Sequence, residues 1–234
     1  MLNHELDASQ LRATFQKNNR IQIPNILQPQ AAEVLYDCLH KQVPWTLAYM
    51  DEDGGHTLSK TELEKLTPDD QRVLGDRIKL IAKDQFQFVY NSYMMVTAYK
   101  ERRDQHLVLH SVLEYFNASE WLDFIRAITD INNVVKVDAQ ATRYLPGHFL
   151  KSHNDVEPAQ GRLAAYVLNL TRGWKADWGG LLHFTNGSRN VVHTYVPRFN
   201  SLTIFKVPAD HCVSCVAPYA RRARYAITGW FMSQ

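Results

Sequence analysis

The chain has 234 residues, with 26 Lys or Arg and 24 Asp or Glu, so its formal net charge is only +2. This near-balance argues against a general nucleic-acid or membrane-surface binder, because such proteins usually carry a larger basic excess. Hydrophobic residues make up 45% of the chain and charged residues 21%, which excludes a wholly disordered protein and suffices for one sizeable core.

Targeting signals and cysteine usage indicate the compartment. No apolar run approaches the roughly 20 residues that a transmembrane helix needs, and the first ten residues lack the cationic and apolar regions of a secretory signal. The three cysteines, Cys38, Cys212 and Cys215, are too few and odd in number for a disulfide framework. We therefore expect a cytoplasmic protein that binds neither nucleic acid nor membrane.

The chain changes character near Asn132, and we expect one domain over residues 1–234. Residues 1–131 predict mostly helical support, and residues 132–234 predict a β core. The first part should hold an edge strand over 20–24, a loop over 50–56, and helices over 29–40, from 67 onward, over 106–116 and over 119–129. In the second of these helices, the spacing of the apolar residues predicts one buried face made of Val73, Leu74, Ile78 and Ile81.

The second part of the chain is rich in short strand patterns separated by Gly, Pro and Asn. Strands are expected near residues 134–144, 163–170, 181–185, 201–207, 211–216 and 223–231. Six short strands in one run favour a β sandwich or barrel with the helices packed outside, which is an α+β fold with a mainly β core.

Three features of the β part point to a metal site. In His153-Asn154-Asp155 on an extended segment, the His and Asp side chains point to the same side, because the strand period is two. His211, from a distant strand, would complete a face of two histidines and one carboxylate, which is the geometry of non-haem Fe(II) oxygenases. Arg224 on the last strand could then hold the far carboxylate of 2-oxoglutarate through a bidentate ion pair.

These residues stand in an order that resembles the Fe(II)- and 2-oxoglutarate-dependent oxygenases of the prolyl 4-hydroxylase type, including the hypoxia-sensing and ribosomal-protein prolyl hydroxylases. The resemblance covers about residues 134–232 and rests on Tyr144–Gly147, His153–Asp155, Tyr166–Asn169, Trp178–Phe184, Ser201–Val207, His211 and Arg224–Trp230. It implies a double-stranded β-helix, or jelly-roll, with N-terminal supporting helices.

The resemblance also implies roles for single residues. The expected Fe(II) ligands are His153, Asp155 and His211, and Arg224 would bind the C5 carboxylate of 2-oxoglutarate. Tyr144 matches a tyrosine that hydrogen-bonds this cosubstrate, and Tyr166 and Thr228 are further cosubstrate candidates. Trp230 and Arg143 are expected to line the substrate pocket. A longer gap before Arg224 leaves Arg221 and Arg222 as rivals for the cosubstrate role.

The implied activity is that of a dioxygenase that uses Fe(II), 2-oxoglutarate and O₂, with ascorbate as a supporting reductant, and releases succinate and CO₂. Its expected substrate is a prolyl residue in a protein or peptide, and a free amino acid or small metabolite is the alternative. Two other classes stay open: a non-catalytic jelly-roll that binds a metal or partner, and a zinc module centred on Cys212 and Cys215. Residues 50–56 and 189–197 are candidate loops for substrate contact. The substrate's identity and the oligomeric state are left open.

Overall fold

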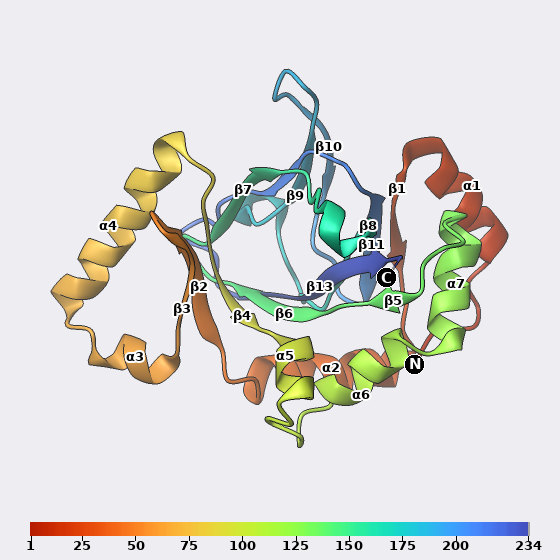
Figure 1. Cartoon of the computed structure of the whole chain (residues 1–234), viewed down its shortest axis with the longest axis horizontal. Coiled ribbons are helices and arrows are strands. Elements are labelled where there is room, and N and C mark those ends of the chain that lie inside the picture. Colours follow the sequence, from red (N-terminus) through yellow and green to blue (C-terminus); the bar gives the residue numbers. More distant parts are fainter. Residues whose placement is uncertain (234) are drawn as a thin grey trace.

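The computed structural model describes residues 1–233, which are organised around one sheet with helices on its outer side (Figure 1). Its strands are β1 Arg20–Pro24, β2 Thr46–Asp51, β3 Gly54–Leu58, β4 Phe88–Tyr93, β5 Lys136–Val137, β6 Gln140–Tyr144, β7 Phe149–His153, β8 Arg162–Asn169, β9 Leu182–Thr185, β10 Val191–Tyr195, β11 Ser201–Lys206, β12 His211–Val213 and β13 Arg224–Met232. Its α-helices are α1 Ala8–Asn18, α2 Pro29–Lys41, α3 Lys60–Lys65, α4 Pro68–Asp84, α5 Met95–Lys100, α6 Leu109–Phe116 and α7 Ser119–Thr129. Among residues 1–233, every helix is too short or too polar to traverse a lipid bilayer.

The sheet is antiparallel and curls on itself. Ten strands follow the order β1-β11-β8-β13-β6-β4-β7-β12-β9-β10, and the longest strand, β13, pairs with β8 on one side and with β6 and β5 on the other. Side chains from β8, β9, β11 and β13 meet in one inner cluster, so β9 faces strands that lie far from it in this order. This is the double-stranded β-helix with supporting helices that the sequence predicts.

Strand alternation separates the two faces of the sheet. On β8, Tyr166 and Leu168 belong to the main core beneath the helices, whereas Ala165 and Val167 belong to the inner cluster. Helices α2, α5 and α6 lie along the outer side of the sheet, and α1 and α7 lie at its end (Figure 1). The outer face therefore carries the main hydrophobic core, and the inner face is left to form a site.

Several predicted elements are confirmed. Residues 20–24 form β1, which pairs with β11 alone and is an edge strand. Helix α2 begins at Pro29, and α4 begins after Thr67, which forms a reciprocal capping box with Asp70. Strands from the first half of the chain pair with strands of the second half in the same sheet. This pairing supports one domain over residues 1–234, which stays a prediction.

Other predictions are wrong. The loop expected over residues 50–56 is the turn of the β2–β3 hairpin, in which Met50 pairs with Gly55. The segment expected to be a loop, residues 189–197, contains the strand β10. Its Val191 and Val192 are both exposed, so this strand lacks the alternation of buried and exposed residues from which strands are predicted. The buried face expected on α4 is largely open: Ile78 is 5% exposed, but Val73 is 53% exposed. The reason is that α3 and α4 project outward beside the β2–β3 hairpin (Figure 1).

Candidate metal centre and cosubstrate pocket

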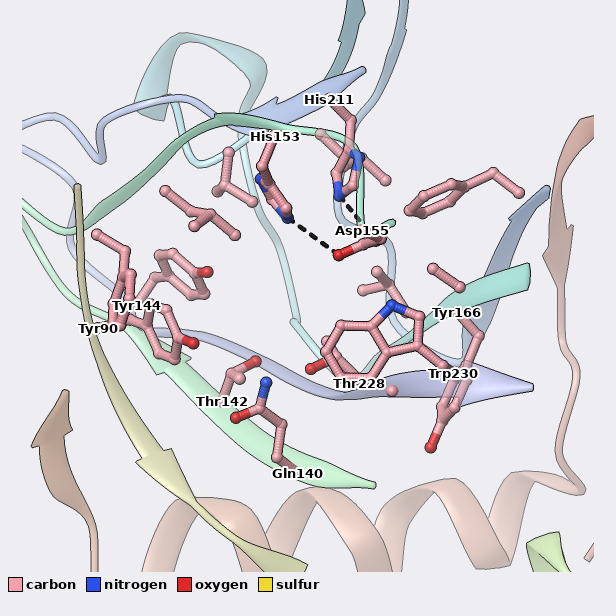
Figure 2. Close-up of a pocket in the computed structure, with 18 of the residues that line it drawn as sticks. Tyr90, Gln140, Thr142, Tyr144, His153, Asp155, Tyr166, His211, Thr228 and Trp230 are labelled. Atoms are coloured by element: carbon pink, nitrogen blue, oxygen red, sulfur yellow. Dashed lines mark ion pairs between the residues drawn. The ribbon is translucent and has the colours of Figure 1, made fainter. Parts of the chain in front are cut away.

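His153, Asp155 and His211 converge at the inner face of the sheet (Figure 2). His153 ends β7 and His211 begins β12, and the two residues are directly paired across these antiparallel strands. The Nε2 atom of His153 lies 3.3 Å from Oδ1 of Asp155, and Nε2 of His211 lies 3.5 Å from Oδ2. One ligand atom from each residue lies within 4.8 Å of the other two. A single ion could therefore contact all three side chains.

Asp155 reaches this position by a turn rather than by strand alternation. Strand β7 ends at His153, and Asp155 has a left-handed backbone with φ of +63°. A non-glycine residue in this region is uncommon and costs on the order of 1–3 kcal/mol, a strain that tends to occur at functional sites. The predicted convergence of His153 and Asp155 is thus found, but the predicted reason for it is wrong.

Backbone carbonyl groups fix the orientation of both imidazoles. Nδ1 of His153 lies 3.0 Å from the carbonyl oxygen of Lys151, and Nδ1 of His211 lies 2.8 Å from that of Ala209. When each Nδ1–H donates to its carbonyl, each Nε2 presents a lone pair toward Asp155. Such hydrogen bonds behind the ring are typical of metal-ligating histidines. Two imidazole nitrogens and one carboxylate thus fit a divalent transition-metal ion such as Fe(II).

The protonation states also suit a metal site. Burial lowers the pKa of His211 to about 4, so its imidazole is neutral at pH 7, as a ligand must be. Burial alone would raise the pKa of Asp155, but the hydrogen bond from His153, the interactions with the two imidazoles and a hydrogen bond from Trp230 outweigh it. The pKa of Asp155 therefore lies below its ordinary value, and the carboxylate is ionised at neutral pH.

Arg224 is a buried cation without a carboxylate partner among the described residues. It begins β13 and is 2% exposed, and its Nε and Nη1 atoms make no hydrogen bond there. Its guanidinium carbon lies 4.9 Å from the ring centre of Tyr144, its register partner on β6. Burial lowers the pKa of Arg224. Because an unpaired buried charge is costly, this arrangement indicates a site for an anionic ligand.

The triad and Arg224 line one cavity of about 400 Å³. Tyr144, Thr228 and Trp230, three of the predicted pocket residues, line it too (Figure 2). The indole of Trp230 lies under the guanidinium of Arg162, with 3.6 Å between the guanidinium carbon and the ring centre. Aromatic and hydroxyl side chains therefore line the cavity between the three possible metal ligands and the buried cation.

Sequence reasoning missed a second wall of this cavity. Gln140 and Thr142 on β6 line it beside Tyr144, and this i, i+2, i+4 spacing on a predicted strand was a signal available in the sequence. Phe88 and Tyr90 on β4 line it as well. Strand β4 itself was not predicted, so no sequence pattern placed these aromatic rings near the triad.

Two further predicted residues are placed differently: Tyr166 borders the cavity but directs its hydroxyl away from it, and Arg143 is not among the lining residues (Figure 2). The Tyr166 ring packs against Phe116 and Phe231 in the main core, and its hydroxyl donates to the carbonyl oxygen of Asp138 at 2.8 Å. Arg143 alternates with Tyr144 on β6, so its guanidinium lies outside the barrel, 5.2 Å from the ring centre of Trp45. These contacts do not support the cosubstrate role expected for Tyr166 or the substrate-pocket role expected for Arg143, and both roles stay predictions.

The remaining candidates lie outside the cavity. Arg221 and Arg222 line a separate hollow on the outer side of β13, so they do not compete with Arg224 for the same ligand. Cys212 is half-buried on β12 and Cys215 is exposed, and both are free thiols. No cysteine belongs to a group of three possible metal ligands among residues 1–233.

The sequence is similar to known proteins over the same region. Residues 139–232 match the family described as the 2OG-Fe(II) oxygenase superfamily. Prolyl 3-hydroxylase OGFOD1 from Xenopus laevis is 30% identical over 141 residues, which are 56% of this chain and 26% of the relative. The Mus musculus protein of the same name is 27% identical over 139 residues, which are 56% and 24% of the two chains. This chain thus spans about a quarter of the length of these curated relatives.

Solved structures share the fold over nearly the whole chain. A Pseudomonas putida prolyl-4-hydroxylase superposes with a TM-score of 0.61 at 16% identity and covers 97% of this chain and 100% of that one. A Trichoplax adhaerens prolyl hydroxylase, solved with a peptide fragment of the hypoxia inducible factor oxygen degradation domain, also gives 0.61, at 17% identity over 97% and 89%. With its His-Asp-His triad inside a double-stranded β-helix, the chain is similar in sequence to the 2OG-Fe(II) oxygenase superfamily over residues 139–232 and shares its fold with solved prolyl hydroxylases.

Proposed function

We propose that this chain is an Fe(II)- and 2-oxoglutarate-dependent dioxygenase that hydroxylates a prolyl residue in a protein or peptide. One observation carries the proposal: the triad and the unpaired, fully buried Arg224 line the same cavity. A metal-binding interaction module would need the three ligands but would have no use for a costly buried cation beside them. The pairing of the two groups is what an oxygenase with a dicarboxylate cosubstrate requires.

The residues divide the work as follows. His153, Asp155 and His211 would hold Fe(II) on one face and leave the cavity side of the ion open. Arg224 would bind the C5 carboxylate of 2-oxoglutarate in a bidentate ion pair, with the Tyr144 ring against its guanidinium. When bound, iron and 2-oxoglutarate would supply the activation of O₂ that oxidises an unactivated C–H bond, with release of succinate and CO₂.

The protein's own contribution is orientation and exclusion of water. Phe88, Tyr90 and Tyr144 form a continuous aromatic wall, with ring centres 5.2 Å apart for the first pair and 5.1 Å for the second. At the triad end, the Phe86 ring lies 5.7 Å from that of His153 and is 42% exposed. Thr228 and Trp230 border the cavity from β13. This apolar lining would shield the reacting centre while the hydroxyl and indole groups orient the substrate.

The prolyl substrate is the finer part of the proposal. It is supported by the names of the similar proteins, which are prolyl hydroxylases, and by the peptide present in the Trichoplax adhaerens structure. A free amino acid or small metabolite is the competing substrate class. The two classes differ in the groups attached to the reacting ring. Flanking peptide bonds should therefore increase turnover only if the substrate is a protein or peptide.

An anaerobic titration of the metal-free chain with Fe(II) and then with 2-oxoglutarate tests the oxygenase function. A visible charge-transfer band from the chelated 2-oxo acid is expected, and it should be absent from His153→Ala. Folded protein that gives no band would contradict the function. Succinate release with prolyl peptides and with free proline then tests the substrate, and faster turnover of free proline would contradict the peptide assignment.

A further inference from the structure

A second cationic site lies on the outer side of β13, behind the cosubstrate pocket. It is a hollow of about 250 Å³ whose cationic lining is Arg172, Arg221 and Arg222, with His40 beside them. Tyr225 forms part of its wall, and this residue follows Arg224 on β13, so the two side chains lie on opposite faces of the strand. The hollow is thus separate from the catalytic cavity.

Two of the arginines are held in place by this chain's own structure. The guanidinium of Arg172 lies between two rings, 4.5 Å from the centre of Tyr36 and 4.7 Å from that of Phe199. Arg222 donates from Nη1 to the carbonyl oxygen of Arg172 at 3.4 Å. Its guanidinium also lies over Gly173, where a Cβ atom would come within 3.1 Å of Nη1. Gly173, with φ of +58°, therefore leaves the space that brings the second guanidinium beside the first.

Acidic groups balance only part of the charge in this hollow. Glu33 pairs with Arg172, but no described carboxylate pairs with Arg221 or Arg222. The Nε atom of Arg172 is buried and makes no hydrogen bond. Arg143, the register partner of Tyr225 on β6, adds a further cation nearby. In a chain of net charge +2, this is a strong local excess of positive charge, and an anion would relieve the repulsion.

We propose that Arg172, Arg221 and Arg222 form a binding site for a phosphoryl group, either inorganic phosphate or a phosphate monoester of a small molecule. Adjacent guanidinium groups match the bidentate geometry of phosphate oxygens. The ring of Tyr36 is already covered by Arg172 and by His40, whose ring centre lies 5.6 Å away, so it offers no face for stacking a nucleobase. A compact anion therefore fits the hollow better than a nucleic acid.

The position of the site suggests what its ligand would influence. Arg221 and Arg222 belong to the segment between His211 on β12 and Arg224 on β13. The inner side chains of the same segment, Val216 and Ala220, pack in one cluster with Tyr144 of the cosubstrate pocket. An anion bound on the outside would order the connection between a metal ligand and the cosubstrate arginine.

Isothermal titration calorimetry with the intact chain tests the site. The protein is first saturated with 2-oxoglutarate, so that Arg224 is occupied, and is then titrated with inorganic phosphate and, separately, with glycerol 3-phosphate at low salt. We expect saturable binding of one equivalent, and the tighter of the two probes identifies whether free phosphate or a monoester is the source. Absence of saturable binding, or displacement of phosphate by 2-oxoglutarate, would overturn the proposal.

Variants distinguish a defined binding site from non-specific electrostatic attraction. Arg222→Gln should weaken phosphate binding roughly tenfold or more, because it removes a guanidinium that can donate two charge-assisted hydrogen bonds to one phosphate group. Arg222→Lys keeps the charge but not the paired hydrogen-bond geometry, so it should also weaken binding. Gly173→Ala changes no charge and should weaken binding as well, because the added Cβ atom displaces the Arg222 guanidinium. Arg189→Gln, an exposed arginine in the β9–β10 turn, is the matched control and should bind as the unmodified chain does. Equal loss in Arg222→Gln and Arg189→Gln, or unchanged binding in Arg222→Lys, would contradict a defined site.

Discussion

Replacing Arg224 by glutamine should abolish tight binding of 2-oxoglutarate while leaving the metal site able to bind an ion. Arg224 is 2% exposed, and its Nε and Nη1 atoms have no hydrogen-bond partner among residues 1–233. Glutamine removes the charge but keeps a polar group on β13. The triad residues come from other segments, so their donor atoms should be unaffected.

The size of the effect follows from the burial of this cation. Truncating one partner of a buried, hydrogen-bonded charge pair costs about 2–5 kcal/mol, which is roughly 30-fold to several thousand-fold in affinity. We expect Arg224 to lie in the upper part of that range, because Arg162, the other arginine that lines the cavity, is engaged elsewhere: its guanidinium lies 3.6 Å from the ring centre of Trp230 and donates to the side chain of Gln160. We therefore expect an increase of at least about 100-fold in the Kd for 2-oxoglutarate.

The assay is the anaerobic charge-transfer titration, with each variant loaded with Fe(II). Arg143→Gln is the matched control, since Arg143 is also half-buried and its Cα pairs with that of Tyr225, the residue after Arg224. It should change the Kd by less than about threefold, apart from any loss of stability. A larger effect in Arg143→Gln, Arg221→Gln or Arg222→Gln than in Arg224→Gln would refute the assignment of the cosubstrate arginine.

The same substitution has a consequence for stability. Burial lowers the pKa of Arg224, which means that the folded protein disfavours this charge when no anion is present. The ligand-free Arg224→Gln variant should therefore have a Tm equal to or above that of the unmodified chain. It should also lose the rise in Tm that 2-oxoglutarate gives to the unmodified chain. A large drop in Tm without ligand would show that Arg224 supports the fold and would weaken the argument from burial.

Three further predictions concern the site and its surroundings. His153→Ala and Asp155→Ala should each abolish 2-oxoglutarate turnover while the far-UV circular dichroism stays unchanged, and measurable turnover in either variant would contradict the ligand set. Cys212→Ser combined with Cys215→Ser should leave the affinity for Co(II) within about twofold, whereas lost binding would restore the zinc hypothesis. Burial lowers the pKa of His148 to about 4, so the unfolded chain takes up this proton first as the pH falls. This group's contribution to stability is fully present above pH ~6.5 and should be lost toward pH ~4, by up to about 3 kcal/mol. Urea unfolding of the ligand-free chain at several pH values should show a flatter profile for His148→Gln, and identical profiles would refute the role of this burial.

The order of chemistry-bearing residues was readable from the sequence alone. His153, Asp155, His211 and Arg224 follow one another through a run of short strand patterns, and local alternation indicated that Arg224, Thr228 and Trp230 share a face of the last strand. The structure places these three along the cavity. Signals of this kind are local, because capping, proline position and strand period act over only a few residues. They also account for the accurate starts of β1, α2 and α4.

Tertiary structure decided which side of each strand faces the cavity and what completes its walls. Tyr144 and Arg143 are neighbours on β6, yet one lines the cavity and the other stacks on Trp45 outside the barrel, and only the packing of the sheet selects between them. Asp155 meets His153 through a left-handed turn that no strand pattern encodes. Strand β4, from the helical part of the chain, inserts between β6 and β7 and supplies Tyr90 to the cavity. Such placements depend on contacts between segments far apart in the sequence, so they arise only once the sheet has curled and its strands are paired.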